Sequence, residues 1–218
     1  MTSPAHDSSG APARGLLISF EGGDGVGKST QLNLLARWLR GRGQVVVTTR
    51  EPGGTPLGVK LRDAVMHGDH VSPHAEALLY AADRAHHVAT VIRPALEVGA
   101  VVLTDRYLDS SVAYQGDGRD LGAAEVERLN LWAVEDLLPD LTVLLDLDPI
   151  VGLGRLTGDP DRLERAGAEF HARTRQAFLD RAASGGRWLV LDAAAGVDEL
   201  QDLIRARVVT LLGADGAS

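Results

Sequence analysis

The stretch Glu21-Gly22-Gly23-Asp24-Gly25-Val26-Gly27-Lys28-Ser29-Thr30 decides the fold of this chain. It follows the apolar run Leu16-Leu17-Ile18-Ser19-Phe20 and precedes an amphipathic segment, residues 31–40. A short apolar run is typical of a buried strand, and the spacing of apolar residues after the stretch is typical of a helix. The sequence therefore predicts a strand, a glycine-rich turn and a helix in direct succession.

Four residues of this stretch, Gly22, Gly27, Lys28 and Ser29, match the spacing G-x-x-x-x-G-K-[ST]. Glycines at these positions let successive backbone N–H groups curl around a phosphate at the positive end of the following helix. We expect Lys28 to neutralise the transferring phosphate and Ser29 to hold Mg2+. An ordinary glycine turn is the alternative, but the flanking strand and helix favour a phosphate loop.

The use of lysine supports this interpretation. Of 22 basic residues only two, Lys28 and Lys60, are lysines. A chain that otherwise uses arginine has kept a lysine where a phosphate loop needs a compact point charge.

The composition limits the class of protein. With 218 residues, 44% of them hydrophobic, the chain can form one α/β domain with a full core, or one domain and a lid. The absence of cysteine excludes disulfides and thiolate metal sites and fits a cytoplasmic location. The net charge of -8 argues against nucleic acid or an anionic membrane as the main partner.

No apolar run approaches the roughly 20 residues needed to span a bilayer. Residues 1–14 are rich in Ser, Ala, Pro and Gly and lack the apolar centre of a secretory signal, so we expect a disordered N-terminal extension. We expect residues 213–218 to form a flexible tail. The predicted domain is residues 15–212, with a lid at about residues 152–165.

Five short apolar runs recur between longer helical patterns and predict an α/β fold with a five-stranded parallel sheet. The runs are residues 16–20, 45–49, 101–104, 141–147 and 188–191. In such a sheet ligands bind outside the carboxyl ends of the strands, where this sequence places acids and arginines. Helices are predicted over residues 29–40, 56–66, 73–97 with an interruption at Pro94, 123–138, 160–183 and 197–212.

Asp105-Arg106-Tyr107 follows the third predicted strand. An acid there can bind a water of Mg2+ beside the phosphate loop, and the adjacent arginine can bind a second phosphate through two N–H groups. The alternative is a simple surface ion pair between the two residues.

Two other segments allow a functional and a purely structural interpretation. Arg50-Glu51-Pro52-Gly53-Gly54 ends the second strand, where its backbone could approach an acceptor, although a tight turn also explains Pro-Gly-Gly. Tyr80 and Arg84 lie four apart, on one helix face, where they could stack on a planar base and donate to its carbonyl. Core packing with a surface salt bridge is the alternative for this pair.

Five histidines cluster loosely in the sequence: His67, His70, His74, His86 and His87. The glycine and proline between the first three prevent a common helix face, so a zinc site is not expected. We expect these histidines to be solvated.

Three motifs that follow the phosphate loop resemble those of bacterial thymidylate kinases, within the P-loop nucleoside monophosphate kinases. They are REPGGTPLG (residues 50–58), YAADRAHH (80–87) and DRYLDSSVAYQG (105–116). The similarity runs from about residue 16 to residue 209. It implies transfer of the γ-phosphate of ATP to dTMP in dTTP synthesis, with Mg2+, on a five-stranded parallel sheet with helices on both faces and a short lid, in a homodimer.

The resemblance also implies roles for individual residues. Asp24 would lie near the phosphoryl path, Tyr80 would stack near thymine, and Tyr114 would crowd the sugar 2' position. Ser29 and Asp105 would serve the metal. The residues expected to bind ATP are Gly22, Gly23, Asp24, Gly25, Val26, Gly27, Lys28, Ser29 and Thr30, and those expected to bind dTMP are Glu51, Pro52, Tyr80, Arg84, Arg106, Ser111, Tyr114 and Gln115.

One departure from the family concerns the lid. In members whose phosphate loop has glycine at the position of Gly25, a mobile lid supplies the catalytic arginines, yet residues 152–164 here are short and poor in arginine. An arginine at the γ-phosphate can change the rate by roughly 10³ to 10⁵. We expect Arg155 and Arg162 to join Lys28, Asp24 and Arg106 as catalytic residues, without an order between the two.

Three alternatives to a thymidylate kinase can be compared with this interpretation. A related kinase could use another nucleoside monophosphate. A GTPase-like switch would need an Asn-Lys-x-Asp element, which is absent because no lysine follows Lys60. A binding module that has lost turnover through its short lid is the third.

Overall fold

The computed structural model describes residues 14–157, 159 and 161–214. The expected N-terminal extension, apart from residue 14, and most of the expected tail lie outside the described residues. The described part of the tail is helical, because α9 (Val197–Ala214) continues two residues past the predicted end of the domain. Among the described residues no helix is long and apolar enough to cross a membrane.

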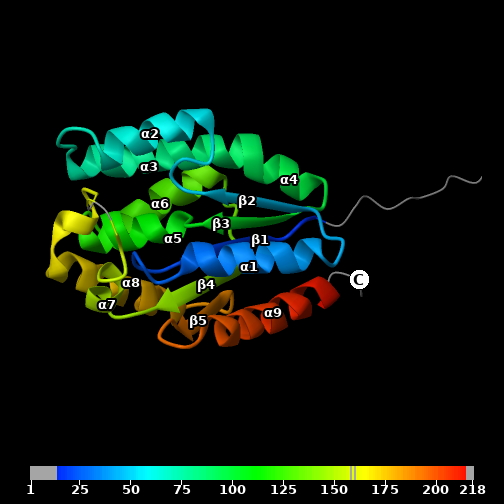
Figure 1. Ribbon diagram of the computed structural model, residues 1–218. Coiled ribbons are helices and arrows are strands. Elements are labelled where there is room, and N and C mark those ends of the chain that lie inside the picture. Colours follow the sequence, from blue (N-terminus) through cyan, green and yellow to red (C-terminus); the bar gives the residue numbers. More distant parts are fainter. Residues whose placement is uncertain (1–13, 158, 160, 215–218) are drawn as a thin grey trace, which may run out of the picture.

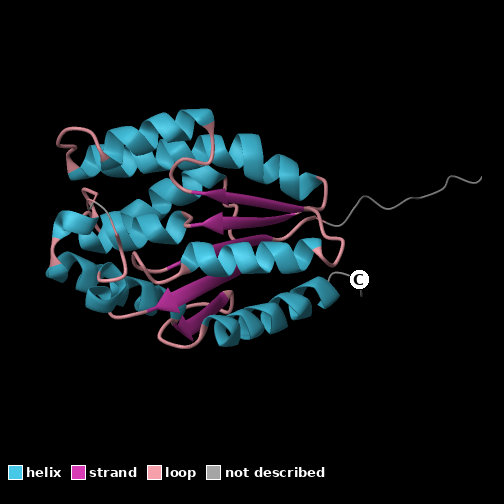
Figure 2. Ribbon diagram, in the orientation of Figure 1, coloured by secondary structure: helices cyan, strands magenta, loops and turns pink. Residues whose placement is uncertain are grey.

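A parallel five-stranded sheet forms the centre of the molecule, as predicted (Figure 2). Its strands stand in the order β2-β3-β1-β4-β5, and every neighbouring pair is parallel. They are β1 (Leu17–Glu21), β2 (Val46–Arg50), β3 (Val101–Asp105), β4 (Leu141–Asp146) and β5 (Trp188–Asp192). From β1 the chain passes to β2 and β3, which lie on one side of β1, and then crosses to β4 and β5 on the other side. In such a sheet the ligand crevice is expected at the carboxyl end of β1, where the chain changes side.

Helices cover both faces of this sheet (Figure 1). Successive residues of β1 point to opposite faces, so Ile18 packs with α1 (Lys28–Arg40) and α9, while Leu17 packs with the helices of the other face. These apolar clusters fix the strand ends, and therefore the loops that follow them, in one arrangement.

Between Pro73 and Glu97 the structure contains three helical segments rather than one. They are α3 (Pro73–His87), the π-helical turn η1 (Val88–Ile92) and α4 (Arg93–Glu97). Pro94 has no N–H and its ring would clash with the carbonyl of residue 90, so the preceding turn widens. The interruption was predicted at Pro94 itself but lies just before it.

Two predicted helices were wrong in their bounds. The helix predicted to end at residue 138 is α6 (Ala123–Val134), because Glu135 and Asp136 have φ values of 50° and 57° in the left-handed region. The helix predicted over 160–183 is α8 (Ala168–Ala182), which starts only after Gly167. Of the predicted lid, residues 152–165, the described part begins in α7 (Pro149–Leu153) and ends in a short 3₁₀ turn, η3 (Glu164–Ala166).

Three more helical segments complete the fold. The helix α2 (Pro56–Met66) has the predicted bounds, and its first turn is capped by Thr55, whose Oγ1 accepts the N–H of Gly58 at 2.9 Å. After β3 come α5 (Leu108–Ser111) and the π-helical turn η2 (Val112–Gly118), which the sequence analysis did not predict. They bring Ser111, Tyr114 and Gln115 back toward α3.

Candidate active site

The phosphate loop connects β1 to α1, as predicted. Gly25 has a φ of 73°, and a Cβ at this residue would lie 1.9 Å from the carbonyl oxygen of Gly152. Only glycine fits this approach between the loop and α7. The first helical residue is Lys28, whose Nζ donates to the carbonyls of Gly22 at 3.2 Å and Gly23 at 2.5 Å.

Electrostatics at the loop are set by burial and by Arg106. Burial, together with the charge of Arg106, lowers the pKa of Lys28 from 10.5 to about 8. Burial alone would raise the pKa of Asp24, but Arg106 and Lys28 outweigh it and lower that pKa to about 2. Asp24 is therefore ionised at neutral pH, while Lys28 loses its proton more easily than an ordinary lysine as long as no anion is bound.

Arg106 lies at the centre of the site, on a backbone with a φ of 71°. A non-glycine residue with a positive φ costs of order 1 kcal/mol, and such strained residues often lie at functional sites. Its guanidinium donates to Asp24 Oδ1 at 2.5 Å, to Tyr114 Oη at 3.1 Å and to the Gly22 carbonyl at 3.0 Å. Arg106 therefore joins the phosphate loop to the π-helical turn η2.

Ser29 and Asp105 meet across α1 and β3. The hydroxyl of Ser29 donates to Asp105 Oδ2 at 2.6 Å, and neither partner is tied to Arg106. The expected alternative, an ion pair between Asp105 and Arg106, is wrong because Arg106 pairs with Asp24. Hydroxyl and carboxylate oxygens are the donors that Mg2+ prefers, and phosphates and waters usually complete its shell. The pair therefore fits the expected metal.

A pocket of about 330 Å³ lies beside Arg106. All eight residues expected to bind the acceptor line this pocket: Glu51, Pro52, Tyr80, Arg84, Arg106, Ser111, Tyr114 and Gln115. The same wall includes Met66, Ser110 and Leu163, which the sequence analysis did not name. Residues from five separate parts of the chain are thus brought to one concave surface.

Arg84 is almost completely buried, with 2% of its surface exposed. Its Nε donates to Glu51 Oε2 at 2.6 Å, its Nη1 to Ser111 Oγ at 2.9 Å and to Asn130 Oδ1, and its Nη2 to the Tyr107 carbonyl at 3.2 Å. A surface salt bridge, the expected alternative for this residue, is therefore wrong. These contacts use four of the five guanidinium N–H groups and leave one on Nη2 for a ligand.

Tyr80 lines the same pocket one turn before Arg84. It is buried, and its hydroxyl has no hydrogen-bond partner among the described residues. Burial and the nearby Glu76 raise the pKa of Tyr80, so the hydroxyl stays protonated. The aromatic ring and the remaining N–H of Arg84 can therefore face one planar ligand.

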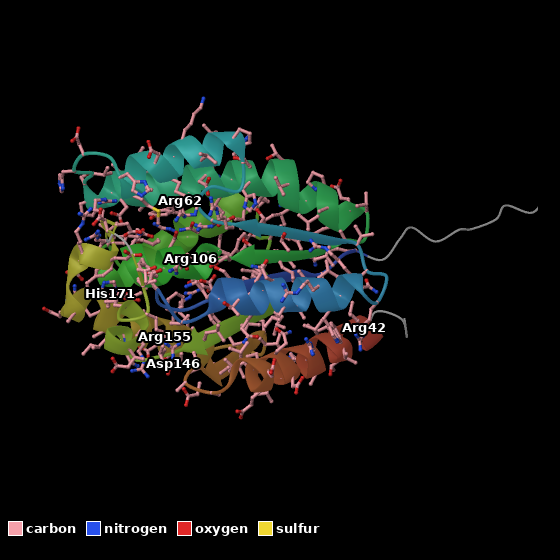
Figure 3. All side chains as sticks on the ribbon, in the orientation of Figure 1. Arg42, Arg62, Arg106, Asp146, Arg155 and His171 are labelled. Carbon is pink, nitrogen blue, oxygen red and sulfur yellow. The ribbon has the colours of Figure 1, made fainter. Side chains whose placement is uncertain are left out.

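The pocket opens into a larger cleft of about 1040 Å³ that contains the phosphate loop. Glu51, Met66 and Arg106 line both spaces. Figure 3 shows Arg62, Arg106 and Arg155 at this end of the sheet and Arg42 at the opposite end. Of the residues expected to bind ATP, Gly22, Gly23 and Val26 do not line the cleft; they line a smaller pocket behind the loop, against β4 and α8.

The two lid arginines have different surroundings. Arg155 lines the cleft with the phosphate loop. Arg162 lies outside its lining and is held by the Val65 carbonyl at 2.7 Å and by the buried carboxylate of Glu76 at 2.7 Å. This difference separates two residues that the sequence left equivalent.

The cleft also contains a residue that the sequence analysis missed. Arg62 lines it from α2, and its Nη1 donates to the Pro52 carbonyl at 3.2 Å. A signal was present in the sequence, because Gly58, Arg62 and Met66 are spaced four apart and share one face of α2.

The prediction that the histidines are solvated was wrong for His87. Its side chain is completely buried, with Nδ1 2.8 Å from Glu51 Oε1 and Nε2 2.6 Å from Thr49 Oγ1. Within the described ranges no group of three or more His, Asp or Glu side chains is placed to hold a metal ion.

Comparison with known proteins gives one family. The family model described as thymidylate kinase matches residues 20–204. A thymidylate kinase of Leifsonia xyli is 62% identical, over 89% of this chain and 94% of its own length. One from Clavibacter michiganensis is 59% identical, over 94% and 99% of the two chains, and one from Deinococcus radiodurans is 51% identical, over 90% and 97%.

Proposed function

Because the chain belongs to the thymidylate kinase family of nucleoside monophosphate kinases, we propose that it transfers the γ-phosphate of ATP to dTMP, giving dTDP and ADP. The observation that carries this proposal is the position of Arg106. This one guanidinium contacts the phosphate loop and lines the acceptor pocket, so a donor and an acceptor phosphate would both lie within its reach.

The phosphate loop supplies the donor half of the reaction. In the free protein Lys28 donates to the Gly22 and Gly23 carbonyls, and a bound phosphate would take over this ammonium. Backbone N–H groups at the start of α1 would hold the same anion. The transfer itself involves little covalent chemistry for the protein, since positioning and charge neutralisation provide most of the rate.

Ser29 and Asp105 would hold Mg2+ at the edge of the cleft. The metal, when bound, would supply positive charge to the phosphate oxygens. Arg106, Arg155 and Arg62 line the cleft around that position, so they would neutralise the remaining charge. No general base is needed, because the acceptor phosphate is already anionic.

We expect the acceptor pocket to prefer thymine. The remaining Nη2–H of Arg84 can only donate, so it suits a base that presents a carbonyl oxygen and opposes one that presents an amino group. Tyr80 supplies an apolar surface for stacking. Tyr114 is held by Arg106 and by Asp24, at 3.1 Å and 3.3 Å, so its ring is fixed where we expect the sugar 2' carbon.

A coupled assay of ADP release with ATP, Mg2+ and one of dTMP, dUMP, dCMP or dGMP tests this function. A strong preference for dTMP is expected. Equal rates with dTMP and dCMP would contradict the thymine assignment, and tight binding of dTMP without ADP release would point to the binding module with an inactive lid.

We also propose a homodimer and a cytoplasmic location. Trp132 on α6 is 80% exposed, and tryptophan is enriched in interfaces between protein chains. Light scattering of the purified chain should give twice the monomer mass, and Trp132→Glu should lower it to the monomer value. A monomeric wild type at micromolar concentration would refute the dimer. The location follows from the substrates, since ATP and dTMP are cytoplasmic metabolites.

A further inference from the structure

A row of hydrogen-bonded groups lies behind the acceptor pocket, and the proposed chemistry does not use it. It runs from Thr49 on β2 through His87 on α3 to Glu51 and then to Arg84. The consecutive distances are 2.6 Å, 2.8 Å and 2.6 Å. Arg84 and Glu51 line the pocket, whereas His87 and Thr49 do not. The row thus leads from the sheet edge to the side chain expected to read the base.

Both ring nitrogens of His87 are engaged, and none of the ring is exposed. The ionised carboxylate of Glu51 can only accept, so Nδ1 of His87 carries the hydrogen of that bond. Thr49 then fixes the other edge of the ring, because its hydroxyl can accept from or donate to Nε2. The imidazole therefore has one orientation, and it presents an N–H to Glu51.

The backbone around His87 is fitted to this arrangement. A Cβ at Gly54 would lie 2.5 Å from His87 Nε2 and 2.6 Å from Thr49 Oγ1. The Pro-Gly-Gly turn therefore packs directly on the bond between Thr49 and His87, and a side chain at Gly54 would push the two apart. This close approach explains the glycine at residue 54, which the sequence alone could attribute to a turn or to an acceptor.

The two oxygens of Glu51 are divided between two partners. Oε1 accepts from His87 and Oε2 accepts from Arg84 Nε. Without His87 the carboxylate could rotate about its last bond, and the guanidinium of Arg84 would turn with it. Only one N–H of Arg84 remains for a ligand, so a small rotation of the guanidinium would point this donor away from the base.

We propose that His87 is a positioning residue for recognition of the acceptor base. It holds Glu51, and through Glu51 it fixes the direction in which Arg84 donates. The inference rests on the proposed function, since it assigns to His87 the preference for a base with a carbonyl oxygen. His87 does not line the cleft that contains the phosphate loop, although Glu51 lines both spaces, so we expect a larger effect on dTMP than on ATP.

The test compares four variants and one control by steady-state kinetics with dTMP and dCMP. His87→Leu removes both bonds. His87→Asn keeps an N–H near the Nδ1 position and so can still bind Glu51, whereas His87→Gln places its amide near the Nε2 position and can reach only Thr49. Thr49→Val removes the outer anchor alone. His86→Asn, the same change at the neighbouring residue, is the matched control.

His87→Leu should raise KM for dTMP about tenfold and lower the dTMP to dCMP ratio of kcat/KM by a similar factor, with KM for ATP within about twofold. His87→Asn should recover most of this loss, His87→Gln should not, and His86→Asn should match the wild type. The assay temperature is set from melting curves so that each variant is folded.

Two results would overturn the role of His87. One is an unchanged KM for dTMP in His87→Leu, and the other is an equal loss of dTMP and ATP affinity in both His87→Leu and His87→Asn. Failure of the proposed function is a different result, because the wild type itself would then show no preference for dTMP.

Discussion

The acceptor pocket and the phosphate loop solve the same problem, holding a polar ligand, in opposite ways. In the pocket, Arg84 makes four hydrogen bonds to the protein and keeps one N–H for the ligand. At the loop, Lys28 and Arg106 are bound to the Gly22 and Gly23 carbonyls and to Asp24, groups that incoming phosphates would displace. The pocket is thus prearranged, whereas the charged groups at the loop are bound to other protein groups that the substrate must replace.

This difference predicts two kinds of mutational effect. Residues of the loop exchange their partners when substrate binds, so their loss should reduce turnover. Residues of the pocket keep their partners, so their loss should reduce affinity and selectivity.

The largest expected effect is that of Lys28→Ala, which should lower kcat about 10³-fold or more because the transferring phosphate loses its ammonium. The fold should persist, since a buried lysine whose pKa is lowered to about 8 is not a stabilising group. Coupled ADP release and circular dichroism measure the two quantities. Lys60→Ala, at the exposed second lysine, is the control, and near-normal turnover of a folded Lys28→Ala would refute the role.

The next largest effect is expected at the lid, where the two arginines should differ. Arg155→Ala should lower kcat by about 10² to 10³, because Arg155 lines the cleft beside the loop. Arg162→Ala should instead leave Glu76 with one charged partner fewer, which raises KM for dTMP and lowers the melting temperature by a few degrees. The exposed Arg165→Ala is the control. A larger loss of kcat from Arg162→Ala than from Arg155→Ala would reverse this assignment.

A smaller effect is expected at Tyr114. Tyr114→Ala should reduce the preference for dTMP over its ribonucleotide about tenfold, because the ring that crowds the 2' position is gone. Tyr114→Phe keeps the ring and should retain the preference, although it loses the bonds to Asp24 and Arg106. Competition between the two nucleotides measures the ratio, and an unchanged ratio in Tyr114→Ala would count against this role.

The smallest expected effect is the uptake of a proton when ATP binds. At pH 8 about half of the free protein should carry a neutral Lys28, because its pKa is lowered to about 8. Bound phosphate raises that pKa, so ATP binding should take up about half a proton at pH 8 and almost none at pH 6. Calorimetry in buffers of different ionisation enthalpy measures the uptake, with Lys28→Met as the reference. Thymidine, which carries no phosphate, should take up none; equal uptake by wild type and Lys28→Met would refute the prediction.

The same lowered pKa has a consequence for stability. Between about pH 8 and 10.5 the unfolded chain binds more protons at Lys28 than the folded one, so this residue makes stability rise with pH there. Glu21 acts in the opposite sense: burial, with the negative charge of Asp109, raises its pKa from 4.5 to about 8. Its contribution is therefore present below pH 4.5 and is lost as pH rises through 8.

Local patterns in the sequence were enough to predict the sheet and the glycine-rich loop, whereas the roles expected of Tyr80, Ser111 and Tyr114 came from the resemblance to the family. The spacing of Gly22, Gly27 and Lys28 predicts the loop between β1 and α1, and Asp105-Arg106 follows a strand next to β1. Both signals lie within a few residues, so no tertiary information was needed to find them.

The features that escaped prediction depend on distant partners or on single backbone angles. His87 looked like a surface histidine, because the groups that bury it, Thr49 and Glu51, lie 38 and 36 residues away in the sequence. The early end of α6 depends on left-handed angles at Glu135 and Asp136; aspartate tolerates this conformation, but glutamate seldom adopts it. Arg162 differs from Arg155 because Val65 and Glu76, both far from it in sequence, hold its guanidinium.

The most direct test of the contrast between a prearranged pocket and a self-paired loop is a calorimetric titration of dTMP into Lys28→Ala. If the pocket is complete without the loop lysine, this variant should bind dTMP within about threefold of the wild-type affinity while its ADP release is nearly abolished. A loss of dTMP affinity that matches the loss of turnover would contradict the account, because the two regions would then form only together.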